Sequence, residues 1–160
     1  MTFGAVKVWD LFSRQVADLA PEGGLQAFLA FSPDAHLLAF TDQSLDRHGT
    51  IGLWDTRTQQ RLAPVVNTNY VGMMGFSPDG RWFAFGIASL DGRKRLLVQE
   101  FGARKQVSEL PGQTPIAESH KGYAFVFTPD SQQIIASETD GRIMRWNFVA
   151  GSKAEYFHAH

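Results

Sequence analysis

The sequence predicts an all-β fold built from tandem copies of one unit of about 45 residues. The motif Phe31-Ser32-Pro33-Asp34 returns 45 residues later as Phe76-Ser77-Pro78-Asp79, and 51 residues after that as Phe127-Thr128-Pro129-Asp130. A second motif runs in phase with the first and consists of Trp9-Asp10, Trp54-Asp55 and Trp146-Asn147. Two motifs that share one period indicate a repeat protein, in which neighbouring units bury apolar surface that one unit cannot bury alone.

Each unit is predicted to begin with two strands joined by the Ser/Thr-Pro-Asp turn. Proline ends the first strand because it has no N–H to donate to a ladder, and the turn residues reverse the chain. The predicted first strands are 25–31, 70–76 and 123–127. The second strands, 37–40, 82–88 and 134–136, are apolar runs without alternation, so we expect both of their faces to be covered.

The third and fourth strands complete each unit. The predicted third strands are 6–9, 51–54, 96–99 and 143–146, and the predicted fourth strands are 15–19, 61–66, 106–110 and 154–157. The fourth strands are more polar, as is typical of the outer edge of a sheet. In the second complete unit the tryptophan has been replaced by Gln99, whereas Glu100 keeps the acidic neighbour.

These two motifs and their spacing resemble the WD-repeat β-propeller family, and the resemblance covers nearly the whole chain. It implies β-propeller blades, each a four-stranded antiparallel sheet standing next to the following one. The implied organisation is one WD-repeat segment over 1–160, with a half blade at 1–20 and whole blades at 21–66, 67–111 and 112–160.

The family also implies a structural network in each blade. There a His, a Ser or Thr, a turn Asp and the Trp share buried hydrogen bonds, and the matching residues of the last blade are His120, Ser137, Asp140 and Trp146. The Gly-His dipeptide that usually supplies the His is absent from the two preceding blades, so those blades are expected to rely on apolar packing or on partial networks such as Asp46 with Trp54.

Three and a half blades predict an incomplete ring, because propellers close with about four blades or more. The missing blades would come from a longer chain or from a second copy, which would make about seven blades in total. We favour a longer chain, because Met1 falls where the second hairpin of a repeat is expected and the segment 158–160 resembles the start of another repeat.

Composition limits the classes of partner. The chain has 160 residues, no cysteine and a formal net charge of −1, which favours neither nucleic acid nor an acidic membrane as a partner. We find no secretory signal and no apolar run of about 20 residues, so a cytoplasmic location is expected. The longest predicted loop, 111–122, is polar enough to be a surface connection.

A search for catalytic chemistry favours no enzyme. There is no Gly-rich phosphate loop and no Gly-x-Ser-x-Gly nucleophile motif. His158 and His160 are too few for a metal site at a chain end, and paired acids such as Glu138 and Asp140 are expected to accept backbone N–H bonds in turns. We therefore expect no catalytic residue, no metal and no cofactor.

One group of loops predicts a binding surface. Equivalent loops of successive propeller blades lie side by side, which would gather the basic and aromatic residues Arg47, His48, Tyr70, Arg93, Lys94 and His120 into a candidate partner-binding face. Its basic residues would suit an acidic peptide or a phosphate-bearing partner. Solvated turns that keep the sheet edges soluble are the alternative.

We therefore expect a non-catalytic scaffold that binds other proteins or peptides. The alternative is a regulatory or sensing propeller segment of a larger enzyme, either a peptidase or a bacterial signalling kinase. The turn 76–81 supports this alternative, because it is also similar to turns in the propellers of prolyl-oligopeptidase-like peptidases and of periplasmic TolB-like proteins.

Overall fold

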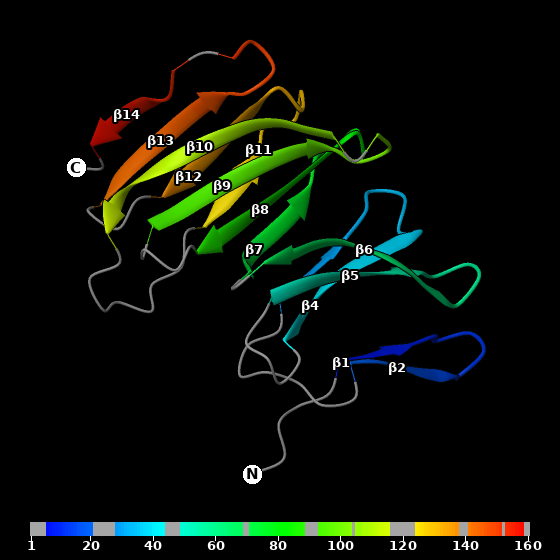
Figure 1. Cartoon of the computed structure of the whole chain (residues 1–160). Helices are drawn as coiled ribbons and strands as arrows, with labels where there is room; N and C mark the ends of the chain where they lie inside the picture. The colour runs from blue at the N-terminus through cyan, green and yellow to red at the C-terminus, as the bar shows by residue number, and fades with distance from the viewer. Residues whose placement is uncertain are drawn as a thin grey trace.

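The computed structural model describes residues 6–20, 28–43, 49–68, 71–88, 93–103, 105–115, 124–137, 141–151 and 153–158. The regular structure of these ranges is β throughout, with fourteen strands in one two-stranded and three four-stranded antiparallel sheets (Figure 1). These sheets do not close into a ring. Across the same ranges there is no helix whose length and apolarity would let it cross a membrane.

Each sheet is formed by consecutive strands. The first sheet consists of β1 (Val6–Trp9) and β2 (Val16–Ala20). The second consists of β3 (Leu29–Phe31), β4 (Leu37–Gln43), β5 (Gly49–Asp55) and β6 (Gln60–Thr68). The third consists of β7 (Val71–Phe76), β8 (Trp82–Ala88), β9 (Arg93–Glu100) and β10 (Lys105–Pro115). The fourth consists of β11 (Phe125–Phe127), β12 (Gln133–Ser137), β13 (Arg142–Asn147) and β14 (Glu155–His158).

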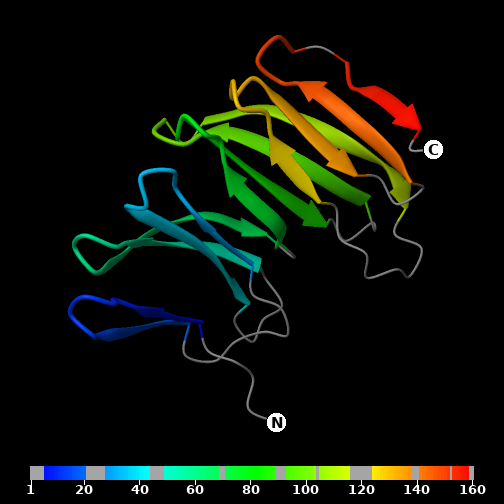
Figure 2. The same ribbon diagram turned by 180° about the vertical axis from the view of Figure 1, so that it is seen from behind.

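The sheets stack face to face as a fan, with the first and fourth sheets at its two ends (Figures 1 and 2). Strand β7 lies close to both β3 and β11, so the first strands of successive sheets converge on one side of the fan. This radial arrangement confirms the predicted β-propeller blades in an incomplete ring.

A strand of the structure overlaps each of the fourteen predicted ranges, but the predicted loop 111–122 is wrong at its start. Strand β10 does not end at 110 and continues to Pro115, with Pro111 opposite Arg95 and Pro115 opposite Arg93. The register shifts between these two prolines. Both prolines are tolerated because β10 is the edge strand of its sheet, where a missing N–H breaks no second ladder.

The second strands of the inner sheets are covered on both faces, as predicted. Leu38 and Phe40 of β4 pack toward the first sheet, whereas Ala39 between them packs toward the third sheet. In β8 the same alternation sends Phe83 toward the second sheet and Ala84 toward the fourth. The hydrophobic core is therefore a series of layers between sheets.

Strand β12 departs from this prediction. Ile134 and Ala136 are buried against the third sheet, but Ile135 between them is 37% exposed. The expectation of two covered faces was wrong here because no described strand packs against the other face of the fourth sheet.

The tryptophan positions follow the same layering. Trp146 is 4% exposed in the layer between the third and fourth sheets, whereas Trp9, on the outer face of the first sheet, is 64% exposed. Gln99 occupies the equivalent position of the third sheet and is only 6% exposed. Within the described part of the chain its amide nitrogen Nε2 has no hydrogen-bond partner, so this replacement leaves a polar group buried without compensation.

One close backbone approach depends on glycine. Gly52 of β5 lies directly opposite Phe40 of β4, and the ring of Phe40 covers it. A Cβ atom added at Gly52 would lie 2.5 Å from Cζ and 2.8 Å from Cε2 of that ring. At the equivalent pair of the fourth sheet the large and small residues are exchanged, because Ala136 lies opposite Met144.

We predict that Gly52→Ala lowers the free energy of unfolding by about 1–3 kcal/mol, because the buried ring of Phe40 must move to accept the methyl group. The midpoint of thermal unfolding, followed by circular dichroism, should fall by about 2–4 °C for each kcal/mol. Gly102→Ala is the matched control, since a Cβ there meets no atom within 4 Å, and it should change stability by under about 0.5 kcal/mol. Equal midpoints for the two variants would contradict the packing described here.

Candidate functional site

The strands of every sheet run between two opposite sides of the fan, and the structure describes one of these sides more fully than the other. In each sheet the turn between the first and second strands and the turn between the third and fourth strands lie at one end, which we call the turn end. The ends of β4, β8 and β12 and the starts of β5, β9 and β13 lie at the opposite end, which we call the loop end. The connections between these strands are 44–48, 89–92 and 138–140. These three connections are outside the described residues, so the detailed geometry below concerns the turn end.

The Ser/Thr-Pro-Asp turns share one hydrogen-bonded arrangement. In the second sheet, Ser32 Oγ donates to Asp34 Oδ1 at 2.6 Å and accepts from the Leu37 N–H at 3.0 Å. The same two bonds recur at Ser77 and at Thr128 in the following sheets. One hydroxyl thus joins the turn carboxylate to the first residue of the next strand, which explains why the motif needs Ser or Thr two residues before Asp.

The carboxylate closes the turn from its other side. Asp34 Oδ1 accepts the His36 N–H at 3.0 Å, and Asp79 and Asp130 accept the equivalent bonds at 3.0 and 3.1 Å. The residue after each Asp has a positive φ, 57° at Ala35, 72° at Gly80 and 58° at Ser131. Only glycine adopts this left-handed conformation without strain, so the bonds to the carboxylate hold the other two turns in place.

These bonds change the acidity of the turn carboxylates. The Ser or Thr hydroxyl first, and the backbone N–H second, lower the pKa of Asp34 and Asp130 below the usual aspartate value, because both stabilise the ionised form. For Asp79 the largest effect is burial, which raises the pKa. Hydrogen bonds, of which those from the Ser77 hydroxyl and the Arg81 N–H are the largest, together outweigh burial, so the pKa of Asp79 is also lowered.

Neighbouring turns contact one another across the sheets. The backbone N–H of Asp79 donates to Ser131 Oγ at 3.1 Å, which joins the turn of the third sheet to that of the fourth. A Cβ added at Gly80 would lie 3.8 Å from Cδ of Pro33 in the turn of the second sheet. The three turns therefore form a continuous row along the turn end.

The turns between third and fourth strands are held by the residue that follows each tryptophan. Asp10 Oδ1 accepts the N–H groups of Phe12 and Ser13 at 2.8 and 3.1 Å. Asp55 accepts the two equivalent bonds at the same distances, and Asn147 Oδ1 accepts the Ala150 N–H at 2.9 Å. The acidic or amide residue of the Trp-Asp/Asn pair thus closes a turn.

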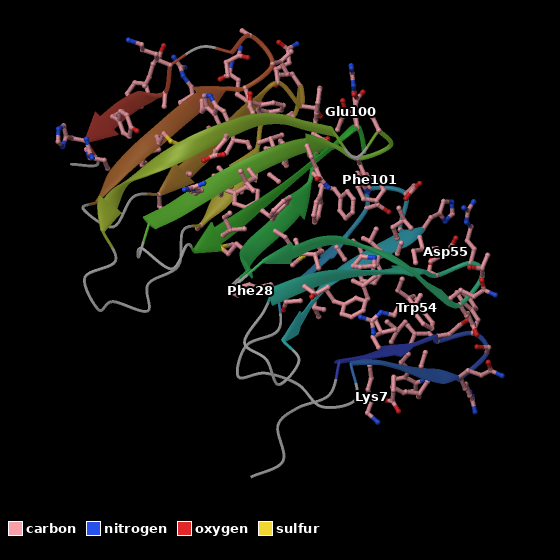
Figure 3. The ribbon with its side chains drawn as sticks, viewed as in Figure 1. Lys7, Phe28, Trp54, Asp55, Glu100 and Phe101 are labelled. Carbon is pink, nitrogen blue, oxygen red and sulfur yellow. The ribbon has the colours of Figure 1, made fainter. Side chains whose placement is uncertain are left out.

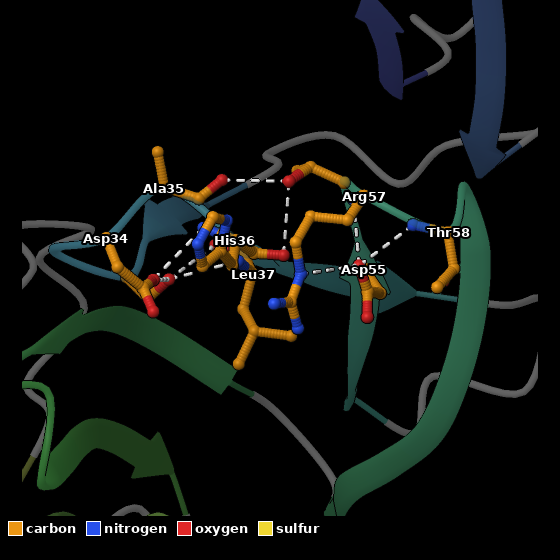
Figure 4. Close-up of polar contacts among 9 residues, drawn as sticks. Asp34, Ala35, His36, Leu37, Asp55, Arg57 and Thr58 are labelled. Carbon is orange, nitrogen blue, oxygen red and sulfur yellow. Dashed lines mark hydrogen bonds and ion pairs between the residues drawn. The ribbon is translucent and has the colours of Figure 1, made fainter.

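The two kinds of turn are joined within a sheet. Thr56 donates its N–H to the His36 carbonyl at 3.0 Å and its hydroxyl to the Ala35 carbonyl at 2.9 Å (Figure 4). In the third sheet, Phe101 N–H donates to the Arg81 carbonyl at 2.8 Å, and the Arg81 side chain also pairs with Glu100 at 3.0 Å. The turn carboxylates of Asp34, Asp79 and Asp130 are therefore occupied in holding backbone. The acids for which this role was predicted, Glu138 and Asp140, lie outside the described residues. Over the described ranges no three His, Asp or Glu side chains gather as a metal site.

The predicted partner-binding face belongs to the loop end. Arg47, His48, Tyr70 and His120 lie outside the described residues. Arg93 and Lys94 form the start of β9, where Arg93 is opposite Pro115 and Lys94 is opposite Ala88, and only their backbone is described.

The predicted network of the last blade is not assembled by its two described members. Trp146 lies opposite Ile134 on the face packed against the third sheet, whereas Ser137 lies opposite Ile143 on the other face. The Ser137 hydroxyl accepts the Ala124 N–H at 3.2 Å. His120 and Asp140 lie outside the described residues.

A further surface lies at the outer side of the first two sheets, where an incomplete ring is expected to leave a blade face exposed. Figure 3 shows Lys7 on the outer side of the first sheet and Trp54 between the first and second sheets. Leu29 and Phe31 of β3 are 53% and 56% exposed, whereas Met74, which occupies the position of Leu29 one repeat later, is 8% exposed. The repeat alignment reveals this surface, because Leu29 and Met74 occupy equivalent positions but only Met74 is covered by a neighbouring sheet.

Comparisons with known proteins support the fold. No protein-family model matches the sequence, and no curated protein matches it. TolB from Acinetobacter baumannii is 23% identical with a TM-score of 0.67, over 94% of this chain and 36% of that chain. The β-propeller domain of the trilobed protease from Pyrococcus furiosus is 12% identical with a TM-score of 0.67, over 97% of this chain and 48% of that chain.

A third solved structure is hydrazine synthase from Kuenenia stuttgartiensis, which is 15% identical with a TM-score of 0.68, over 96% of this chain and 43% of that chain. The chain thus spans 36% to 48% of the length of these three structures. At this level of identity the likeness concerns the fold alone, and that fold is a β-propeller.

We predict that acid weakens the fold through the turn carboxylates. A pKa that is lower in the folded state stabilises the protein above the usual aspartate pKa of about 3.9, and this stabilisation is lost as the pH falls through the folded-state value. Urea unfolding would be measured from pH 7 to about pH 2.5. At pH 7 the free energy of unfolding should be lower for Asp79→Asn than for the wild type, and this difference should become smaller as the pH falls.

The matched control is Asp18→Asn, which removes an exposed ion pair with Lys7 at 3.1 Å. At pH 7 this substitution should change the free energy of unfolding by under about 0.5 kcal/mol, because exposed ion pairs contribute little to stability. If the difference between the wild type and Asp79→Asn were the same at every pH, the turn carboxylate would not be the titrating group.

Proposed function

We propose that the chain is a non-catalytic protein-interaction scaffold built from WD-type repeats, and that its loop end binds other proteins or peptides. The observation that carries this proposal is the stacking of equivalent sheets. Stacking brings equivalent strand ends of successive sheets next to one another on a frame held by buried layers. Such a frame presents a composite surface made of several loops.

The WD-type assignment is supported by the turns between third and fourth strands. The residue after the tryptophan closes this turn in the first, second and fourth sheets, through Asp10, Asp55 and Asn147. A Trp-Asp pair with this role explains why the acid recurs at one spacing. The third sheet uses Glu100 with Arg81 instead, so its unit is the divergent one.

The second candidate function is a regulatory or sensing propeller segment of a larger enzyme. It is favoured by the likeness to a β-propeller domain of a protease, of which this chain spans 48%. The reading frame of the parent gene discriminates the two, because a fused peptidase or kinase domain would support the second candidate.

Charge reversal at the loop end tests the scaffold. The wild-type chain, an Arg47→Glu/Arg93→Glu variant and an Arg14→Glu/Arg57→Glu control would be immobilised and exposed to extract from the source cells. Any captured protein would then be purified, and its affinity for each variant would be measured by calorimetry. The control makes the same change of charge at the turn end, where Arg14 and Arg57 are exposed.

We expect the loop-end variant to bind the partner at least about 10-fold more weakly, because a like charge replaces the one that attracts an acidic partner. The control should bind as the wild type does. Equal affinities of all three proteins would reject the loop end as the binding surface.

A further inference from the structure

We propose that the layer between the second and third sheets is a weak plane at which the stack opens, so that the first two sheets separate from the last two. Each pair would keep one buried layer of its own, which is the layer between its two sheets. The layer between the third and fourth sheets serves as the comparison, because it also lies between two sheets of four strands. Three equivalent positions differ between these two layers.

The first difference is a buried amide without a partner. Gln99 of β9 lies opposite Phe83 of β8, so both side chains face the second sheet. Gln99 is 6% exposed, and over the described ranges its Nε2 has no hydrogen-bond partner. Trp146 is the equivalent residue in the layer between the third and fourth sheets. Because water reaches the Gln99 amide once its layer opens, the open state recovers hydrogen bonds that the closed state lacks.

The second difference lies at the turn end. Between the third and fourth sheets, the Asp79 N–H donates to Ser131 Oγ at 3.1 Å. The residue equivalent to Ser131 in the third sheet is Gly80, which has no hydroxyl to accept the N–H of Asp34. A Cβ added at Gly80 would lie 3.8 Å from Pro33 Cδ, so this residue faces the turn of the second sheet. The hydrogen bond that joins the later two turns therefore has no counterpart here.

The third difference lies in the fourth strands. Ser108 of β10 donates its hydroxyl to the Phe148 carbonyl of the fourth sheet at 3.4 Å, which is long for such a bond. Ser108 lies opposite Val98, and the residue opposite the equivalent Leu53 is Leu62. Leu62 has no hydroxyl and packs on the core between the second and third sheets. Neither of the two hydrogen bonds beside the fourth sheet is therefore repeated one layer earlier.

Apolar contact closes the layer between the second and third sheets. Side chains such as Ile51 and Leu53 on one sheet pack against Phe83 and Leu97 on the other. Such contact is non-directional, so it fixes the relative position of two sheets less sharply than a hydrogen bond does. The unpartnered amide of Gln99 destabilises only the closed layer. This layer should therefore open more often than the next one, while the strands of each sheet stay paired.

Opening would separate the loop-end strand ends of the second sheet from those of the third. This consequence rests on the proposed function, because a partner that spans both sheets at the loop end would bind only the closed stack. Partner binding and opening would then oppose each other, and Gln99 would lower the affinity by populating the open state.

Cysteine labelling tests the opening, because the chain has no cysteine of its own. Ala39→Cys places a thiol in the layer between the second and third sheets, and Ala84→Cys places one at the equivalent position of the next layer. Both alanines are fully buried. Labelling by dithiobis-nitrobenzoate would be measured without denaturant, relative to the unfolded chain. We expect Ala39→Cys to react at least about 10-fold faster than Ala84→Cys.

The urea dependence of labelling separates opening from global unfolding. Opening one layer exposes less surface than unfolding, so the labelling rate of Ala39→Cys should rise less steeply with urea than the unfolding constant does. Leu53→Cys and Val98→Cys are a second equivalent pair, on the third strands, and should react in the same order. This pair keeps the test valid if a cysteine on β4 or β8 disturbs folding.

Two changes in the third sheet should slow the labelling of Ala39→Cys. Gln99→Met removes the buried amide and should slow it about 10-fold, whereas the exposed control Gln132→Met should change it by less than about 2-fold. Gly80→Ser supplies the missing hydroxyl in the left-handed conformation that Ser131 already adopts. It should slow labelling more than Gly80→Ala, which adds only the methyl group.

Three results would overturn the proposal. They are equal labelling rates for Ala39→Cys and Ala84→Cys, a urea dependence equal to that of global unfolding, and an unchanged rate in Gln99→Met. All three are measured without a partner, so failure here leaves the proposed binding at the loop end standing. Failure of that binding would in turn leave the opening of the layer unaffected.

Discussion

The packing of the apolar face of each sheet against the next sheet is the contact on which the rest of this structure depends. Ala39 faces Met74, Phe83 and Phe85 in one layer, and Ala84 lies in the layer that holds Trp146. No sheet has a core of its own, because each buries its apolar face only against a neighbour. A unit of about 45 residues is therefore stable only within the stack.

The turns complement this layering with local hydrogen bonds. One hydroxyl and one carboxylate fix the reversal between the first and second strands, and a second carboxylate or amide fixes the reversal between the third and fourth. Contacts such as Asp79 N–H to Ser131 Oγ then align the turns of adjacent sheets. The turn end is thus ordered by hydrogen bonds within and between repeats, whereas the spacing of the sheets is decided by side-chain volume.

The local features of the fold could be predicted from sequence, because the turn chemistry and the strand periodicity lie within a few residues of each other. Features that depend on neighbouring strands or sheets could not be predicted in this way. Strand β10 passes through Pro111 because it is an edge strand, and Ile135 is exposed because its face of the fourth sheet lacks a described neighbour. Neither condition can be read from the repeat itself. Which face of the fourth sheet Ser137 occupies also depends on strand register, because its pairing with Ile143 directs it away from Trp146.

The candidate surfaces divide in the same way. The loop end was predicted from residue type and repeat position, and most of its residues lie outside the described ranges. The incomplete ring predicted an exposed blade face, but not which residues it exposes, since the exposure of Leu29 and Phe31 follows from which strands surround them. Both surfaces require the stack of sheets to hold their position, so the stability of the layers is the property that links fold to function.

Native-state hydrogen exchange of Ala84→Leu tests this central claim most directly. The added side chain would enter the layer between the third and fourth sheets, where overpacking typically costs about 1–3 kcal/mol. We expect amide protection to fall in both β8 and β12, and to be unchanged in the exposed control Ala103→Leu. Loss of protection confined to the third sheet would show that the sheets are stable independently and would contradict the account.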